Sequence, residues 1–320
     1  MTGFPPDTFI CMYFHSPCFA VEFRYMKLQE FVIMAAFSGN MQQILEYTAW
    51  RMDAPPMFGA FHIAAVLIAV IIAAAGAVRA KRLSAGGRFR LLETCGWVLV
   101  ILEVYKQLFL YYVVNGSVYD WWYFPFQLCS VPMYLCIMLP LLYRGADGRG
   151  ADDPGTCAAS PVLTFLAAYT FTGAAAALII PEDYLRSYVT LTLHGFVWHG
   201  ILLLISLTVL LSRTADLSRR AFARATMLFL AMCAAAVCIN IAVEPLMAAY
   251  YEEELIPHSY AAMFYLNPYH LSPQPLVGEI QKSAGIPLGL ALYVISIIAV
   301  SSFLTLLFRR LSNASAESRR

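Results

Sequence analysis

A histidine, a cysteine and a glutamate stand inside apolar stretches of this chain, where an unpaired polar group is costly and calls for an explanation. They are His199, Cys129 and Glu103. A thiol beside an imidazole can act as a nucleophile with the histidine as its general base, and a carboxylate can orient the imidazole. Glu103 can also reach Lys106 at i+3 and Gln107 at i+4 of a helix, which softens the cost of its burial. These residues indicate a buried site for nucleophilic catalysis.

Other polar side chains at a similar depth could support such a site: Gln127, His194, Asn240, Glu244 and His62. Their common depth, in the outer half of the predicted spans or near the midplane, predicts a polar chamber that opens outward. Each also has a structural explanation, because buried amides join helices, a lone cysteine fills space and an ion pair fixes packing. His194 and His199 stand about 140° apart around a regular helix, so both face one chamber only if it is broad or the helix is distorted.

The stretches that hold these residues are each about as long as a membrane is thick. With 60% apolar and 13% charged residues, the composition excludes an ordinary soluble domain. We predict an all-α, polytopic membrane helix bundle of about seven transmembrane helices. Pro125 and Pro132 predict a loosened backbone beside Cys129 in the third span. The spans are expected near residues 57–79, 91–114, 123–143, 159–180, 190–212, 223–246 and 286–308.

The basic residues predict the orientation of the bundle. Most of the 21 lysines and arginines fall in the segments that follow the first, third, fifth and seventh spans. Because cytoplasmic segments carry an excess of Lys and Arg, we expect the N-terminus outside and the C-terminus in the cytoplasm. The long segment Met247–Gly285 then lies outside, and its turn from Asn267 to Pro273 could cap the chamber.

Three regions are expected along the chain: an N-terminal extension at 1–56, a transmembrane domain at 57–308 and a basic cytoplasmic tail at 309–320. The extension mixes apolar and charged residues without a standard secretory signal. A stretch near Leu28–Phe37 could lie on the membrane surface, or the start codon could be placed too early.

No cofactor is predicted, because CxxC pairs and HExxH spacing are absent. Two other functions stay open. One is a transporter of a small solute, ion or proton along the polar residues of the spans. The other is a zinc-dependent intramembrane hydrolase with His62, His194 and His199 around the metal. Nothing indicates nucleic-acid binding, since topology accounts for the basic segments.

Four short patterns carry a resemblance to a known family. They are Phe58-Gly59-Ala60-Phe61-His62, Trp121 to Cys129, Trp198-His199-Gly200, and Asn267 to Pro273. They resemble the YwaF-like bacterial integral membrane proteins, which are related to animal transmembrane protein 164. The resemblance spans residues 57 to 308 and implies a protein of the bacterial cytoplasmic membrane. The animal relative is regarded as a phospholipid acyltransferase that uses a Cys and a His, so the resemblance implies membrane lipid as a substrate.

His199 looks like the equivalent histidine of that family, whereas the cysteine region departs from the pattern. Phe126 stands where animal members place the Cys, and Gln127 replaces a His of the bacterial members. Cys129 is therefore the candidate nucleophile, with Gln127 or Asn240 as the oxyanion donor and Glu103 or Glu244 to orient His199. The leading hypothesis is transfer or hydrolysis of a phospholipid acyl group.

Overall fold

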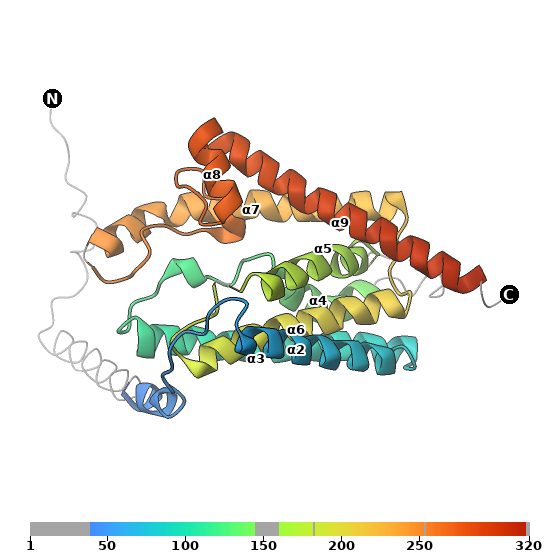
Figure 1. Ribbon diagram of the computed structural model, residues 1–320, viewed down its shortest axis with the longest axis horizontal. Coiled ribbons are helices and arrows are strands. Elements are labelled where there is room, and N and C mark those ends of the chain that lie inside the picture. Colours follow the sequence, from blue (N-terminus) through green and yellow to red (C-terminus); the bar gives the residue numbers. More distant parts are fainter. Residues whose placement is uncertain (1–38, 145–159, 182, 253, 318–320) are drawn as a thin grey trace, which may run out of the picture. The chain divides into compact units, whose positions relative to one another are not determined.

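The computed structural model describes residues 39–144, 160–181, 183–252 and 254–317. The chain divides into two compact units, Met1–Thr48 and Ala49–Arg320. In the first unit residues 39–46 are helical; the stretch Leu28–Phe37, for which a surface position was considered, lies outside the described residues. The second unit contains helices α2 to α9 (Figure 1).

All regular secondary structure in the described part of the second unit is helical. An isolated bridge pairs Arg51 with Tyr188, and no longer strand occurs among the described residues. The predicted all-α class is therefore confirmed. The helices are α2 (Ala60–Ala80), α3 (Ala85–Phe109), α4 (Val131–Arg144), α5 (Ser160–Ile179), α6 (Val189–Leu211), α7 (Arg219–Glu252), α8 (Pro275–Ala284) and α9 (Ile286–Glu317), with short turns η1 (Leu110–Val114), η2 (Trp121–Tyr123) and η3 (Met263–Tyr265).

Among the described residues, six helices are long and apolar enough to cross a membrane, and they coincide with six of the seven predicted spans. The exception is α4, whose apolar part, Val131–Leu142, is shorter. Pro132 has no amide hydrogen to bond the carbonyl of residue 128, which disfavours a regular helix that runs back through Cys129. The segment from Phe124 to Ser130 is accordingly irregular. A polytopic membrane bundle is thus confirmed, with one short helix.

Helix α5 occupies the centre of the bundle. It packs against α4, α6, α7 and α9, and in Figure 1 it lies between the group α2, α3 and α6 and the pair α7 and α9. A helix that carries apolar residues around its whole circumference suits this position, because most of its residues are buried. Two hydroxyl contacts add to the packing, Tyr169 with Thr226 of α7 at 2.7 Å and Thr172 with Ser301 of α9 at 2.9 Å.

Two features of the second unit position the polar residues. Gly96 of α3 allows close approach to α4, because a Cβ there would stand 3.1 Å from the carbonyl oxygen of Met133. The second feature is the outer segment, which we define as residues 254–274 between α7 and α8, named for the orientation predicted from the basic residues. It returns along α7 and brings η3 against that helix (Figure 1).

Candidate functional site

A cavity of about 350 Å³ lies among α3, α5, α6 and α9, with further walls from residues 122–124, 127–130, 183–184 and 264–265 and from Ile180 and Arg186. Of the site residues predicted from the sequence, it is lined by Glu103, Gln127, Cys129, His194 and His199. Its size is within the usual range of small-molecule sites. The π-turn η1 begins at Leu110 on its wall, and such turns occur often at functional sites. Residues from the second to the fifth predicted span therefore converge on one space.

His199 is held in one orientation by its own helix. Its Nδ1 lies 2.8 Å from the carbonyl oxygen of Gly195, and a carbonyl can only accept, so Nδ1 carries the hydrogen. In the neutral ring this leaves Nε2 with a lone pair, and within the described residues no hydrogen bond to Nε2 is present. The Gly195 carbonyl therefore orients the His199 ring, a role that was expected of Glu103 or Glu244. His199 is thus a buried base with its reactive nitrogen free.

Tyr184 packs flat against His199, with ring centroids 5.1 Å apart and 21° between the planes. The Tyr184 hydroxyl donates to the carbonyl of Ala177 at 2.6 Å. Burial raises the pKa of this hydroxyl, so it stays protonated as a donor. Gly195 allows the close approach, because a Cβ there would stand 2.3 Å from two ring carbons of Tyr184. The glycine and the tyrosine together fix the imidazole plane.

Cys129 is half-buried beside the same cavity as a free thiol. Its carbonyl accepts a hydrogen bond from the Trp198 indole at 3.1 Å, which ties the irregular segment before α4 to α6. The cavity is also lined by Lys106, Glu103, Asp183 and His199. Cys129 therefore shares a small space with charged side chains and an imidazole.

Glu103 makes both contacts that its helical spacing predicts. One carboxylate oxygen, Oε1, accepts from Lys106 Nζ at 2.8 Å and from Gln107 Nε2 at 2.6 Å. The other oxygen, Oε2, is buried and has no hydrogen-bond partner among the described residues. Both residues line the cavity, so this pair places a positive and a negative charge in its wall.

His194 also lines the cavity and fastens α6 to α3. Its Nε2 donates to the carbonyl of Leu102 at 3.2 Å, and its ring stacks on Trp198 with centroids 5.5 Å apart. Both histidines reach one cavity from a continuous α6, so the cavity is broad enough to span the angle between them.

The loop before α6 contributes residues that the sequence analysis did not select. Arg186 Nη1 donates to the Tyr123 hydroxyl at 2.8 Å, and its Nε donates to the carbonyl of Asp183 at 2.9 Å. The Tyr265 hydroxyl donates to the Asp183 carboxylate. Burial raises the pKa of Tyr265, and the Asp183 charge raises it further. Arg186 could have been noticed as one of few basic residues on the predicted outer side.

Two amide side chains from different parts of the chain hold η3 by hydrogen bonds to its backbone. Gln127 donates from Nε2 to the carbonyl of Ala262 at 3.0 Å and accepts from the Phe264 N–H at 2.7 Å. Asn240 donates from Nδ2 to the carbonyl of Met263 at 3.1 Å and accepts from the Met263 N–H at 2.7 Å. Both amides therefore form hydrogen bonds to backbone groups of the outer segment. They are not placed as the oxyanion donors that their sequence positions suggested. Gln127 lines the cavity, and Asn240 is absent from its lining among the described residues.

The held turn has an unusual backbone. Phe264 and Tyr265 have φ of 55° and 57°, in the left-handed region that costs a residue with a side chain about 1–2 kcal/mol. The two amide clamps over-determine this conformation, as strained positions require. The result is that Phe264 and Tyr265 form part of the cavity wall. The outer segment thus contributes to the cavity wall through η3, whereas no residue of the turn from Asn267 to Pro273, which was considered as a cap, is among the lining residues of the described chain.

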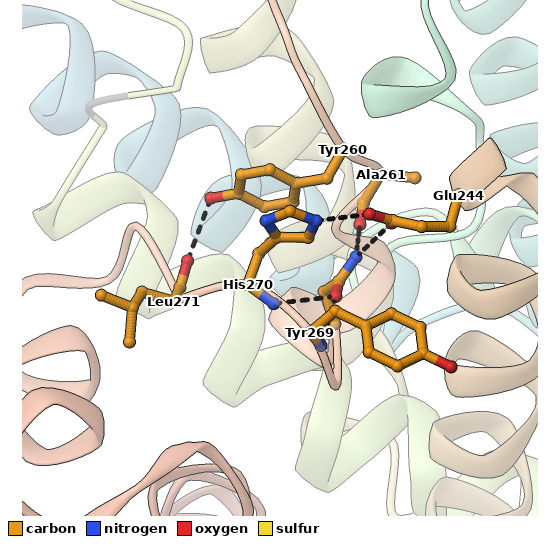
Figure 2. Close-up of polar contacts among 7 residues, drawn as sticks. Glu244, Tyr260, Ala261, Tyr269, His270 and Leu271 are labelled. Carbon is orange, nitrogen blue, oxygen red and sulfur yellow. Dashed lines mark hydrogen bonds and ion pairs between the residues drawn. The ribbon is translucent and has the colours of Figure 1, made fainter. Parts of the chain in front are cut away.

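Glu244 contacts residues of the outer segment and is not among the described residues that line the cavity (Figure 2). Its carboxylate pairs with His270 Nε2 and accepts from Asn267 Nδ2 at 3.2 Å. The His270 ring stacks on Tyr260, with centroids 4.3 Å apart and 5° between planes. Asn267 also donates to the carbonyl of Ala261 at 2.8 Å. This cluster closes the turn from Asn267 to Pro273 onto α7.

A second histidine fastens the other end of the outer segment. His258 Nδ1 lies 2.6 Å from the buried Asp120 carboxylate, and its ring stacks on Trp122 at 4.5 Å with 9° between planes. Both histidines of the segment thus combine a carboxylate partner with an aromatic one. This repeated arrangement fastens the outer segment at two points to the rest of the second unit.

His62 has a structural position away from the cavity lining. Its Nε2 donates to the carbonyl of Leu178 at 2.8 Å, and its Nδ1 accepts from the Phe58 N–H at 3.0 Å. Because both ring nitrogens are used, His62 cannot ligate a metal in this arrangement. Among the described side chains, no group of three or more His, Cys, Asp or Glu is placed to hold a metal ion. The hypothesis of a zinc site formed by His62, His194 and His199 is therefore wrong for this arrangement of side chains.

Helices of membrane-spanning length, around a cavity lined in part by charged and polar side chains, define a polytopic α-helical membrane protein. The family model described as the TMEM164 family matches residues 57–308, and the chain belongs to this family. No curated protein and no solved structure matches the chain.

Proposed function

We propose that the protein transfers or hydrolyses a phospholipid acyl group, with Cys129 as the nucleophile and His199 as its general base. The observation that carries the proposal is the shared cavity: a free thiol and an imidazole with an available Nε2 line the same buried space in a membrane protein. A cavity of about 350 Å³ can hold an ester and the atoms around it, so the acyl chains extend beyond it.

The first half of the reaction forms an acyl thioester. Cys129 Sγ–H gives its proton to His199 Nε2, and the thiolate attacks the ester carbonyl carbon. The ester C–O bond breaks, and the departing lysolipid alcohol takes the proton back from His199. Lys106 brings positive charge to the same cavity and stabilises the oxyanion, a role for which Gln127 and Asn240 are less suited because they bind η3.

The second half releases the acyl group. A hydroxyl of another lysolipid, or of water, attacks the thioester carbonyl, and its proton passes through His199 to the departing Cys129 sulfur as the C–S bond breaks. The product is a new phospholipid in the first case and a fatty acid in the second. Membership of the YwaF-like branch and location in a bacterial cytoplasmic membrane belong to the same proposal, and they rest on the four sequence patterns.

Acyl exchange between labelled phospholipids, measured with purified protein in liposomes, tests this proposal. We expect turnover by the unmodified protein and loss of turnover in Cys129→Ala, because the thiol is the only group assigned to carry the acyl chain. Cys95→Ala is the matched control, since Cys95 is a buried thiol of α3 outside the cavity lining. Full turnover by a folded Cys129→Ala protein would remove Cys129 from the mechanism, and no turnover by the unmodified protein over a broad lipid panel would remove the acyl-transfer proposal.

Replacing Gly195 with alanine is expected to lower kcat by about 100-fold, because the new methyl group displaces Tyr184 and releases the plane of His199. Gly200→Ala on the same helix is the matched control, since its Cβ would meet Ala69 at an ordinary 3.5 Å. The measurement is acyl exchange together with the melting temperature of each variant. Equal kcat in the two alanine variants would show that the Tyr184 contact does not position the base.

A further inference from the structure

A second pocket, of about 910 Å³, lies where α2, α6 and α9 approach their C-terminal ends (Figure 1). Its walls come from three segments that are distant in sequence: Lys81 after α2, residues 209–218 at the end of α6 and in the loop to α7, and residues 308–312 of α9. The two pockets have no lining residue in common among the described residues. This second pocket is therefore separate from the site proposed for acyl chemistry.

The charged side chains that line the second pocket are mostly basic. Among the described residues they are Lys81, Arg213, Arg309 and Asp216, so three positive charges against one negative charge give a net charge of +2. The three basic residues are exposed, so an anion can reach them. The two carboxylate oxygens of Asp216 accept from the N–H and the hydroxyl of Ser218, both at 2.8 Å, and close the turn before α7. We call this site the basic pocket.

Arg213 is placed at the basic pocket by its backbone and by α9. Its φ of 55° lies in the left-handed region, which residues with a side chain seldom adopt. Its Nη2 donates to the carbonyl of Ser312 at 2.8 Å, so the guanidinium joins the loop after α6 to α9. A planar guanidinium held in one place suits a phosphate, because its donors match the spacing of phosphate oxygens.

The remaining wall of the basic pocket is apolar. Leu211 of α6 and Leu311 of α9 line it, and they are 39% and 58% exposed. Both belong to helices that are long and apolar enough to cross a membrane, and both stand near the end of the apolar stretch. Headgroups meet acyl chains at that depth of a bilayer, and basic pockets between transmembrane helices bind anionic headgroups. A soluble anion would use only the basic side chains, whereas a lipid uses both walls.

We propose that the basic pocket binds an anionic phospholipid, with its phosphate against Lys81, Arg213 and Arg309 and its acyl chains along Leu211 and Leu311. A phosphomonoester carries a charge of about −1.5 to −2 at neutral pH, which matches the +2 of the lining. Topology explains why basic residues are frequent in these segments, but it does not explain why three of the segments meet in one pocket with an apolar wall. This binding site is independent of the proposed acyl transfer.

The test compares phosphatidic acid with phosphatidylcholine of the same acyl chains. Binding to the purified full-length protein in a neutral detergent is measured by native mass spectrometry. We expect phosphatidic acid to bind at least about tenfold more tightly, because the choline ammonium offsets the phosphate charge beside three basic side chains. Equal binding of the two lipids overturns the proposal. Glycerol phosphate, which has no acyl chains, should bind far more weakly, and equal binding of this soluble phosphate would overturn the lipid as occupant.

A pair of double variants locates the binding. Lys81→Gln combined with Arg309→Gln should weaken the binding of phosphatidic acid by about 30-fold, since each basic residue near a membrane surface contributes about tenfold or slightly less. Arg213 is retained in this variant because it also holds the loop to α9. Arg82→Gln combined with Arg310→Gln is the matched control, because these exposed neighbours make the same change in net charge but are not among the described lining residues.

The control variant should bind phosphatidic acid nearly as tightly as the unmodified protein. Melting temperatures of both double variants, measured on the same preparations, show whether the fold is retained. Equal losses of affinity in the two folded variants would mean that the general positive charge of this end attracts the lipid, and the defined site would be refuted. The result does not depend on acyl exchange, so the basic pocket and the proposed chemistry can fail separately.

Discussion

Replacing His199 with asparagine is expected to lower kcat for acyl exchange by about 10²- to 10⁴-fold, the usual contribution of a general base. The asparagine NH₂ group can occupy the place of Nδ1 and keep the hydrogen bond to the Gly195 carbonyl, while nothing replaces the lone pair of Nε2. The variant therefore removes the base and retains the local packing. Acyl exchange and melting temperature, measured on the same preparations, separate the two effects.

A double variant tests whether His199 and Cys129 act as one unit. If the imidazole serves only to activate the thiol, Cys129→Ala combined with His199→Asn should be no slower than the slower single variant. If the losses of the single variants multiply instead, the two residues act in separate steps and the assignment of His199 as the base for Cys129 is contradicted.

Replacing Asn240 with leucine is expected to destabilise the protein by about 2–6 kcal/mol, because two buried groups of Met263 lose their partners at about 1–3 kcal/mol each. Leucine has a similar size, and Asn240 is 0% exposed, so neither solvent nor a new cavity complicates the change. The expected fall in melting temperature is about 4–12 °C, at about 2 °C per kcal/mol for a unit of this length. Release of η3 should also lower acyl exchange, since Phe264 and Tyr265 belong to the cavity wall.

Ile241→Leu provides the comparison for this variant, because Ile241 is the next residue of α7 and is 43% exposed on the bundle surface. It should melt within a few degrees of the unmodified protein. An Asn240→Leu protein that melts at the same temperature as Ile241→Leu would mean that the amide does not hold η3.

The fold was largely predictable from the sequence, since apolar length indicates spans directly. The error at the third span has a clear cause in Pro132, which ends regular helix near Cys129, so that only Val131–Leu142 remains apolar helix. Hydropathy counts the irregular segment before α4 with the helix because both are apolar. Composition alone cannot distinguish the two.

The candidate site was predictable in part. Depth and spacing selected the residues of α3 and α6 that line the cavity, because i+3 and i+4 contacts follow from helix geometry. They did not show the direction in which Asn240 and Glu244 point, toward Met263 and His270 of the outer segment. Contacts with distant segments depend on how the chain folds back after α7. No periodic pattern in the sequence indicates that path.

Asp183, Tyr184 and Arg186 were missed for the same reason. Their loop reaches the cavity only because α5 and α6 pack together, and Tyr184 meets His199 only because residue 195 lacks a side chain.

Mass spectrometry of the purified protein after brief incubation with a labelled phospholipid tests the central assignment most directly. The account predicts an acyl thioester on the Cys129 peptide, cleaved by neutral hydroxylamine and much reduced in His199→Asn, because the imidazole activates the thiol. Acyl exchange at full rate with no acyl adduct on Cys129, or with the adduct on another side chain, would contradict it.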